Sequence, residues 1–171
     1  MKRMALLASS LLALAAPALM GAPNGKGTGT VPHQITGVLE GTLTFVPFPN
    51  AVTPFDVDAL GDASGIVKDL GRTAMFTFHR PVPDGSGGVK DGLVRIVAAS
   101  GDTLRGKYVG ITVWGSEPNQ LIGNADFVVT GGTGRFANAS GTIHATSYTT
   151  FLGFDVFEWP VTWVLEGTVS Y

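Results

Sequence analysis

Residues 103–114 read TLRGKYVGITVW, and their alternation is the clearest indication of the fold class. Leu104, Tyr108 and Trp114 fall on one face together with two glycines, and the charged side chains fall on the other face. An apolar period of two residues predicts a β-strand with one buried side, because successive side chains of a strand point in opposite directions. Glycine inside a strand costs stability unless it permits a bend or a close approach. Its position on the apolar face therefore predicts a sheet that coils sharply around a closed interior.

The same pattern recurs along the chain, where glycine again shares a face with bulky hydrophobic residues in the runs 34–46, 121–130 and 161–170. No window supports a helix of three turns, since glycine recurs too often and the apolar period is not 3.6. We predict an all-β protein, an eight-stranded antiparallel closed β-barrel that forms a single domain over residues 34–171. The expected strands lie near 34–46, 64–69, 72–79, 92–99, 103–114, 121–130, 140–150 and 161–170. The segments 46–62 and 151–160 are expected to be loops that pack over a barrel end or form an oligomer contact.

The N-terminus has the features of an export signal: a basic start at Lys2 and Arg3, an apolar run, and an A-x-A site. These features predict a secreted or periplasmic protein with no membrane anchor after cleavage. The expected organisation is a signal peptide over residues 1–22, cleaved after Ala18 or Ala22, and a flexible leader over 23–33.

Composition narrows the chemistry. The chain has no cysteine, so thiol nucleophiles and metal thiolates are excluded. It has 11 Lys and Arg against 13 Asp and Glu; without Lys2 and Arg3 the count is 9 against 13, a net charge of −4. No basic cluster remains, which disfavours nucleic-acid binding. The three histidines lack the spacing of a zinc site, so no metal is expected.

A glycine-rich segment follows the predicted strand 121–130. Its residues Gly132, Gly134 and Ala137 match the spacing of a dinucleotide-binding loop. Such a loop must open a helix whose N-terminus faces the phosphates. Here a Thr-, Ile- and Tyr-rich strand follows instead, and the chain lacks repeating βαβ units. We therefore expect no nucleotide and no other cofactor.

The same segment, residues 128–141 (VVTGGTGRFANASG), resembles the turn of the allene oxide cyclase and dirigent barrel superfamily, especially its exported bacterial members. Residues 65–72 and 99–106 also resemble recurring segments of those proteins. The resemblance implies an eight-stranded barrel with an apolar cavity, in which the plant enzymes steer a reactive substrate and dirigent proteins orient radicals. Related barrels often assemble as dimers or trimers, so a homo-oligomer is a candidate state. The resemblance also implies structural roles in a tight turn for Gly131, Gly132, Gly134 and Phe136.

The predicted interior has almost no ionisable group, whereas acid–base catalysis needs one inside the site. An uncharged lumen suits a small apolar ligand. The candidate lining residues are Tyr108, Trp114, Phe127 and Trp163, although the same aromatic side chains would also fill a solid core. His79 and His144 have no evident partner, which favours structural roles for both. No catalytic residue can be assigned from the sequence.

Three functions remain open. The first is an exported soluble barrel that binds a small apolar molecule or serves as a stable module, and the sequence favours such a non-enzymatic role. The second is a cyclase, isomerase or dirigent-like protein that steers a reactive small molecule. The third is an outer-membrane eight-stranded β-barrel, because period-two alternation is the same when the apolar face points to lipid.

Overall fold

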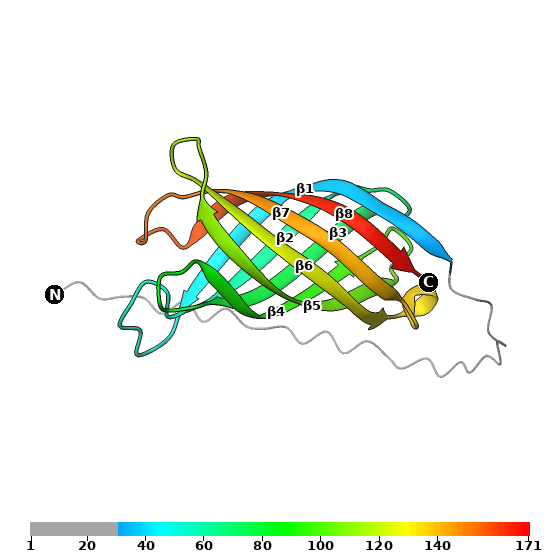
Figure 1. Ribbon diagram of the computed structural model, residues 1–171, viewed down its shortest axis with the longest axis horizontal. Helices are drawn as coiled ribbons and strands as arrows, with labels where there is room; N and C mark the ends of the chain where they lie inside the picture. Colours follow the sequence, from blue (N-terminus) through cyan, green and yellow to red (C-terminus); the bar gives the residue numbers. More distant parts are fainter. Residues whose placement is uncertain (1–30) are drawn as a thin grey trace, which may run out of the picture.

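The protein is an eight-stranded antiparallel barrel in the computed structural model, which describes residues 31–171 (Figure 1). The predicted fold class is confirmed. The expected signal peptide and residues 23–30 of the expected leader lie outside the described residues. The strands are β1 (Pro32–Pro47), β2 (Val57–Val67), β3 (Gly71–Pro81), β4 (Gly88–Val97), β5 (Thr103–Trp114), β6 (Gln120–Gly132), β7 (Ser140–Thr150) and β8 (Glu158–Ser170).

Each strand pairs with its neighbour in sequence, and the barrel closes where β1 pairs with β8 over Pro32 to Thr44. The leader was expected to reach residue 33, but Pro32 and His33 already belong to β1 and pair with the end of β8. No helix within residues 31–171 is long and apolar enough to cross a membrane.

The expected boundaries of β2 were wrong, because β2 spans Val57–Val67 rather than 64–69. The segment 46–62 is therefore a loop only over residues 48–56. The inward positions of β2 are mostly small, including Ala59, Gly61 and Ala63, so the alternation is weak in the sequence. Two of them pair with larger residues of β1, Ala59 with Phe45 and Gly61 with Leu43, whereas Ala63 pairs with Gly41.

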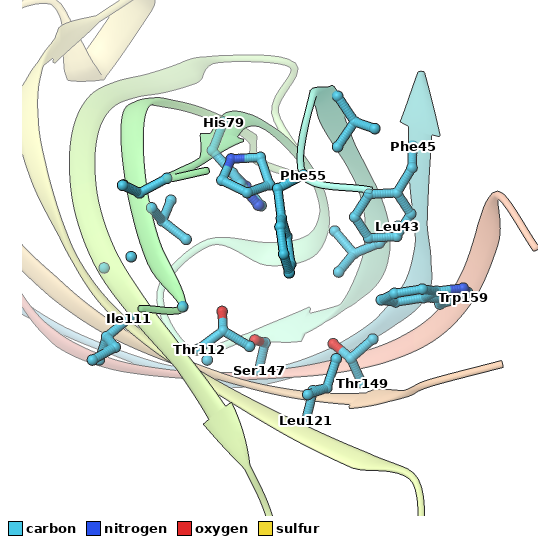
Figure 2. A pocket seen from close by; sticks show the side chains of 18 of the residues that line it. Leu43, Phe45, Phe55, His79, Ile111, Thr112, Leu121, Ser147, Thr149 and Trp159 are labelled. Atoms are coloured by element: carbon cyan, nitrogen blue, oxygen red, sulfur yellow. The ribbon is translucent and has the colours of Figure 1, made fainter. Parts of the chain in front are cut away.

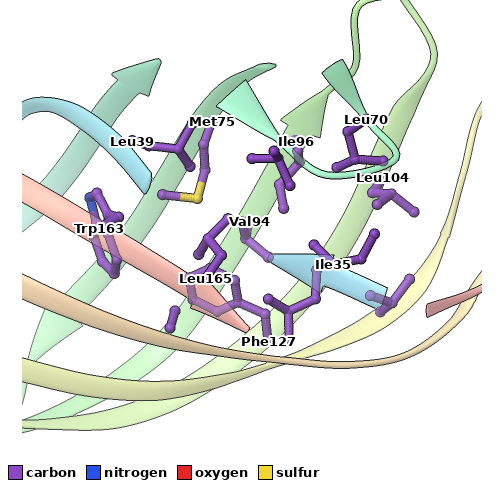
Figure 3. Close-up of a cluster of buried hydrophobic side chains, with 14 of the residues drawn as sticks. Ile35, Leu39, Leu70, Met75, Val94, Ile96, Leu104, Phe127, Trp163 and Leu165 are labelled. Carbon is purple, nitrogen blue, oxygen red and sulfur yellow. The ribbon is translucent and has the colours of Figure 1, made fainter. Parts of the chain in front are cut away.

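Bulky hydrophobic side chains fill the interior of one half of the barrel (Figure 3). Leu39, Phe127 and Leu165 are fully buried, as the alternation predicted. Outward positions of the same strands carry charged side chains, including Glu40, Asp126 and Glu166. Other outward positions of these strands are apolar and exposed, including Val38, Val128 and Val164.

Glycines on the inward face allow adjacent strands to come close. A Cβ atom on Gly41 would overlap the carbonyl oxygen of Asp62 in β2, and one on Gly167 would overlap the carbonyl of Thr142 in β7. The sheet therefore coils most tightly where a side chain would meet the neighbouring backbone.

One end of the barrel is closed by the short connections and by the turn between β6 and β7. Gly131 (φ 118°) and Gly134 (φ 53°) adopt left-handed backbone conformations that favour glycine, and a Cβ on Gly132 would overlap the Thr103 carbonyl. Residues Gly134–Phe136 form one 3₁₀ turn, which buries Phe136 completely. The Phe136 ring packs edge-on against Tyr171, with ring centroids 4.6 Å apart. The other end carries the longer loops 48–56 and 151–157.

Candidate functional site

A cavity of about 620 Å³ opens at the end of the barrel that carries the longer loops (Figure 2). Its size falls within the range of small-molecule sites, about 300–1,000 Å³. Among residues 31–171, no Asp, Glu, Lys or Arg lines it. The walls of the cavity come from the ends of the strands next to these loops. Its mouth is formed by loops 48–56, 82–87 and 151–157.

An aromatic layer separates this cavity from the solid half of the barrel. Tyr108 of β5 and Trp163 of β8 are buried and line the cavity. Phe127 lies between them, with ring centroids 4.9 Å from Tyr108 and 6.1 Å from Trp163. It does not line the cavity itself. The structure therefore places Phe127 one layer deeper than the sequence interpretation did, because the interior is solid below the level of Tyr108.

Trp114, the fourth candidate, lies at the rim. Trp114 lies on the same face of β5 as Tyr108 and lines the cavity. It is the last residue of the strand, and 63% of its surface is exposed. Its ring packs edge-on against Phe151 at 5.3 Å, which joins the end of β5 to the loop before β8. Trp114 is therefore part of the mouth rather than of the floor.

Among the described residues, His79 is the one histidine that lines the cavity, and it has a partner that sequence reasoning missed. Its Nδ1 atom lies 2.9 Å from the Tyr108 hydroxyl oxygen. His79 is on β3 and Tyr108 on β5, so this hydrogen bond passes over β4, where Gly92 pairs with Tyr108. A Cβ on Gly92 would collide with the Tyr108 ring. Glycine at this position therefore lets the two side chains meet.

A β-bulge in β4 lies beside the pair. Val89 and Gly92 pair with Gly110 and Tyr108, so β4 has one residue more than β5 over this span. The register against β3 shifts in the same way next to His79. Asp91, inside the bulge, has a φ of 55°. Bulges bend a strand and redirect side chains at barrel rims and near functional sites.

Three hydroxyl side chains, those of Thr112, Ser147 and Thr149, lie on the wall across from His79 (Figure 2). They come from β5 and β7, with Gly123 of β6 between them. A Cβ on Gly123 would overlap the Ser147 hydroxyl, so glycine keeps space open in front of this wall. The cavity thus combines apolar walls with a few hydrogen-bonding groups on opposite sides.

The mouth is narrowed by two aromatic residues from different loops. The Phe55 and Phe154 rings meet edge-on at 6.1 Å, and Phe55 points into the opening (Figure 2). The Asp56 carboxylate holds the first loop by accepting hydrogen bonds from the backbone N–H groups of Val52 and Thr53 and from the Thr53 hydroxyl. These backbone hydrogen bonds lower the pKa of Asp56. The expectation that the two apolar loops pack over a barrel end fits this arrangement.

Burial sets the protonation states of the pair. It lowers the pKa of His79 to about 4, so the imidazole is neutral at pH 7. It also raises the pKa of the Tyr108 phenol well above its usual value. The pair is therefore neutral at pH 7, and none of the described residues that line the cavity is charged there.

The depressed pKa of His79 has a measurable consequence for stability. An unfolded chain binds a proton at this histidine below about pH 6.5, whereas the folded protein does not until about pH 4. Proton binding to His79 in the unfolded chain therefore lowers the free energy of unfolding. This penalty is absent above pH 6.5 and grows as the pH falls toward 4. Each pKa unit is worth about 1.4 kcal/mol, so we expect an additional loss on the order of 3 kcal/mol relative to His79→Gln. Denaturant titrations of both proteins at pH 7 and pH 4 would measure this difference. Identical losses in the two proteins would contradict it.

No cluster of three metal-ligating side chains occurs in the described part of the chain. His144 lies outside the barrel wall, where its Nδ1 atom is 2.9 Å from a carboxylate oxygen of Asp126. His144 therefore has a partner that the sequence did not reveal, but both side chains are exposed and lie away from the cavity. Their pairing is a surface interaction.

The fold defines a class, the closed antiparallel β-barrels, and in this member the described residues fill one end and leave the other hollow. Among solved structures, the pterocarpan synthase dirigent protein PsPTS1 has a similar barrel fold, with a TM-score of 0.54, 15% identity, and coverage of 85% of this chain and 98% of its own. The pterocarpan synthase dirigent protein GePTS1 matches with a TM-score of 0.51, 16% identity, and coverage of 86% and 89%. The chain thus has the dirigent-like barrel fold that residues 128–141 suggested. No protein-family model matches the sequence, and no curated protein does.

Proposed function

We propose that this protein binds a small, uncharged, largely apolar molecule in the open end of its barrel. The observation that carries the proposal is the cavity of about 620 Å³, which is lined by aromatic and aliphatic side chains and, in the described part of the chain, by no Asp, Glu, Lys or Arg. A ligand that enters it buries apolar surface against rings such as Phe45, Phe55 and Trp159. An ionised ligand would lose its hydration there and find no countercharge.

A fluorescent ketone, 6-propionyl-2-(dimethylamino)naphthalene, tests this proposal at pH 7. We expect saturable binding, with emission that is stronger than in water and shifted to shorter wavelength. The matched control is the corresponding 2-naphthoic acid, which carries an ionised carboxylate in place of the ketone. We expect the acid to bind at least tenfold more weakly, because its desolvation is not compensated. Equal affinity for ketone and acid, or no saturable binding of the ketone, would count against the proposal.

The fold favours a second candidate function, in which the cavity steers a reactive molecule into one conformation. The two matching structures are described as pterocarpan synthase dirigent proteins. An enclosed apolar space that holds one conformer and excludes water can direct a reaction without a charged catalytic group. Turnover of an unstable epoxide or radical precursor, absent when the cavity is filled, would distinguish steering from binding alone.

A further inference from the structure

We propose that His79 is a hydrogen-bond donor to the ligand, and that the cavity selects neutral molecules that carry an acceptor oxygen, such as a ketone, ether or quinone. This inference rests on the proposed function, since it requires that a molecule enters the cavity. It adds the residue that orients the ligand and the chemical group that this residue recognises.

The Tyr108 hydroxyl group needs a hydrogen-bond acceptor, and His79 provides it. Within residues 31–171 its one hydrogen bond of good geometry joins it to Nδ1 of His79, at 2.9 Å. The nearby Thr77 hydroxyl is buried and forms no hydrogen bond of acceptable geometry in this part of the chain. A buried O–H group without an acceptor is unfavourable. The phenol therefore donates to Nδ1.

The position of the His79 proton follows from the chemistry of a neutral imidazole, in which one nitrogen carries the proton and the other accepts. When Nδ1 accepts from Tyr108, the proton lies on Nε2. No group in the described residues forms a hydrogen bond with Nε2. His79 lines the cavity and points into it (Figure 2), so its N–H group is presented to a ligand.

The rest of the lining agrees with an acceptor on the ligand. Within residues 31–171 no carboxylate side chain lines the cavity, and the Nε2–H group of His79 has no hydrogen-bond partner. An acceptor oxygen complements such a donor, whereas a ligand that is only a donor does not. The indole N–H of Trp163 also has no partner in this part of the chain, but its nitrogen is fully shielded, so we assign it no contact with the ligand.

The test compares 6-propionyl-2-(dimethylamino)naphthalene with its 6-propyl analogue, which has a methylene group in place of the carbonyl. We expect the wild-type protein to bind the ketone about tenfold more tightly, as one hydrogen bond of roughly 1.4 kcal/mol gives. This preference should disappear in His79→Phe and persist in His79→Gln, whose amide N–H₂ restores a donor. The emission of the bound ketone should shift to shorter wavelength in His79→Phe, because its carbonyl loses a hydrogen bond. The matched control is His144→Phe, on the outer face, which should retain the preference.

A measurement on the unmodified protein does not depend on the folding of any variant. The ¹⁵N shifts of His79 should identify the tautomer protonated at Nε2, and protonation at Nδ1 would overturn the inference. Equal affinity of the wild type for ketone and methylene analogue would also overturn it, while leaving the binding function intact. If neither compound binds, both the inference and the proposed function fail.

Discussion

Thr112→Trp is expected to lower the affinity for the fluorescent ketone at least tenfold relative to the wild type. Thr112 lies on β5 with its side chain directed into the cavity (Figure 2). The indole would occupy the space in front of the hydroxyl wall formed with Ser147 and Thr149. A ligand would then have to displace a packed aromatic group, which costs more than its own burial returns. Titration of the ketone by fluorescence measures the change.

The matched control for this substitution lies three residues away on the same strand. Val109 is outside the barrel wall and 71% exposed, so Val109→Trp adds the same side chain to β5 without entering the cavity. We expect Val109→Trp to bind the ketone as the wild type does. Equal affinities for Thr112→Trp and the wild type would show that the ligand occupies another place.

Phe127→Ala is expected to lower the free energy of unfolding by about 3–5 kcal/mol, the usual cost of removing a fully buried aromatic ring. The ring has no exposed surface and supports both Tyr108 and Trp163 from below. Its removal would leave a void between the solid half of the barrel and the cavity. Denaturant unfolding at pH 7 measures the loss.

Val128→Ala provides the control, because Val128 is the next residue of β6 and points outward with 52% of its surface exposed. We expect a change within about 1 kcal/mol there. A comparably small effect for Phe127→Ala would mean that the aromatic layer does not support the cavity floor.

The sequence was sufficient to predict the barrel, because the alternation in β1, β5, β6 and β8 places bulky residues and glycines on one face. Gly41 and Gly167 lie where strands come too close for a side chain, which is the role that their positions suggested. The pattern failed in β2. Its inward positions Ala59, Gly61 and Ala63 are small, so hydrophobicity alone could not mark the strand.

The candidate site was only partly predictable. The alternation along β5 and β8 predicted that Tyr108 and Trp163 point inward, and both residues line the cavity. The sequence could not show the depth at which the interior becomes solid, so Phe127 was placed in the lining. The partner of His79 was missed because it lies two strands away. One signal was present in Gly92, since an isolated glycine in a strand marks a bulge or a close approach.

Amide shifts in a ¹H–¹⁵N NMR titration with the fluorescent ketone locate the ligand in the unmodified protein. We expect saturable shifts at the open end of the barrel, including Thr112, Gly123 and Ser147, and none at the closed end around Leu70 and Phe136. Shifts concentrated at the closed end or on the outer face, or no saturable shifts at all, would contradict a ligand site in the barrel mouth.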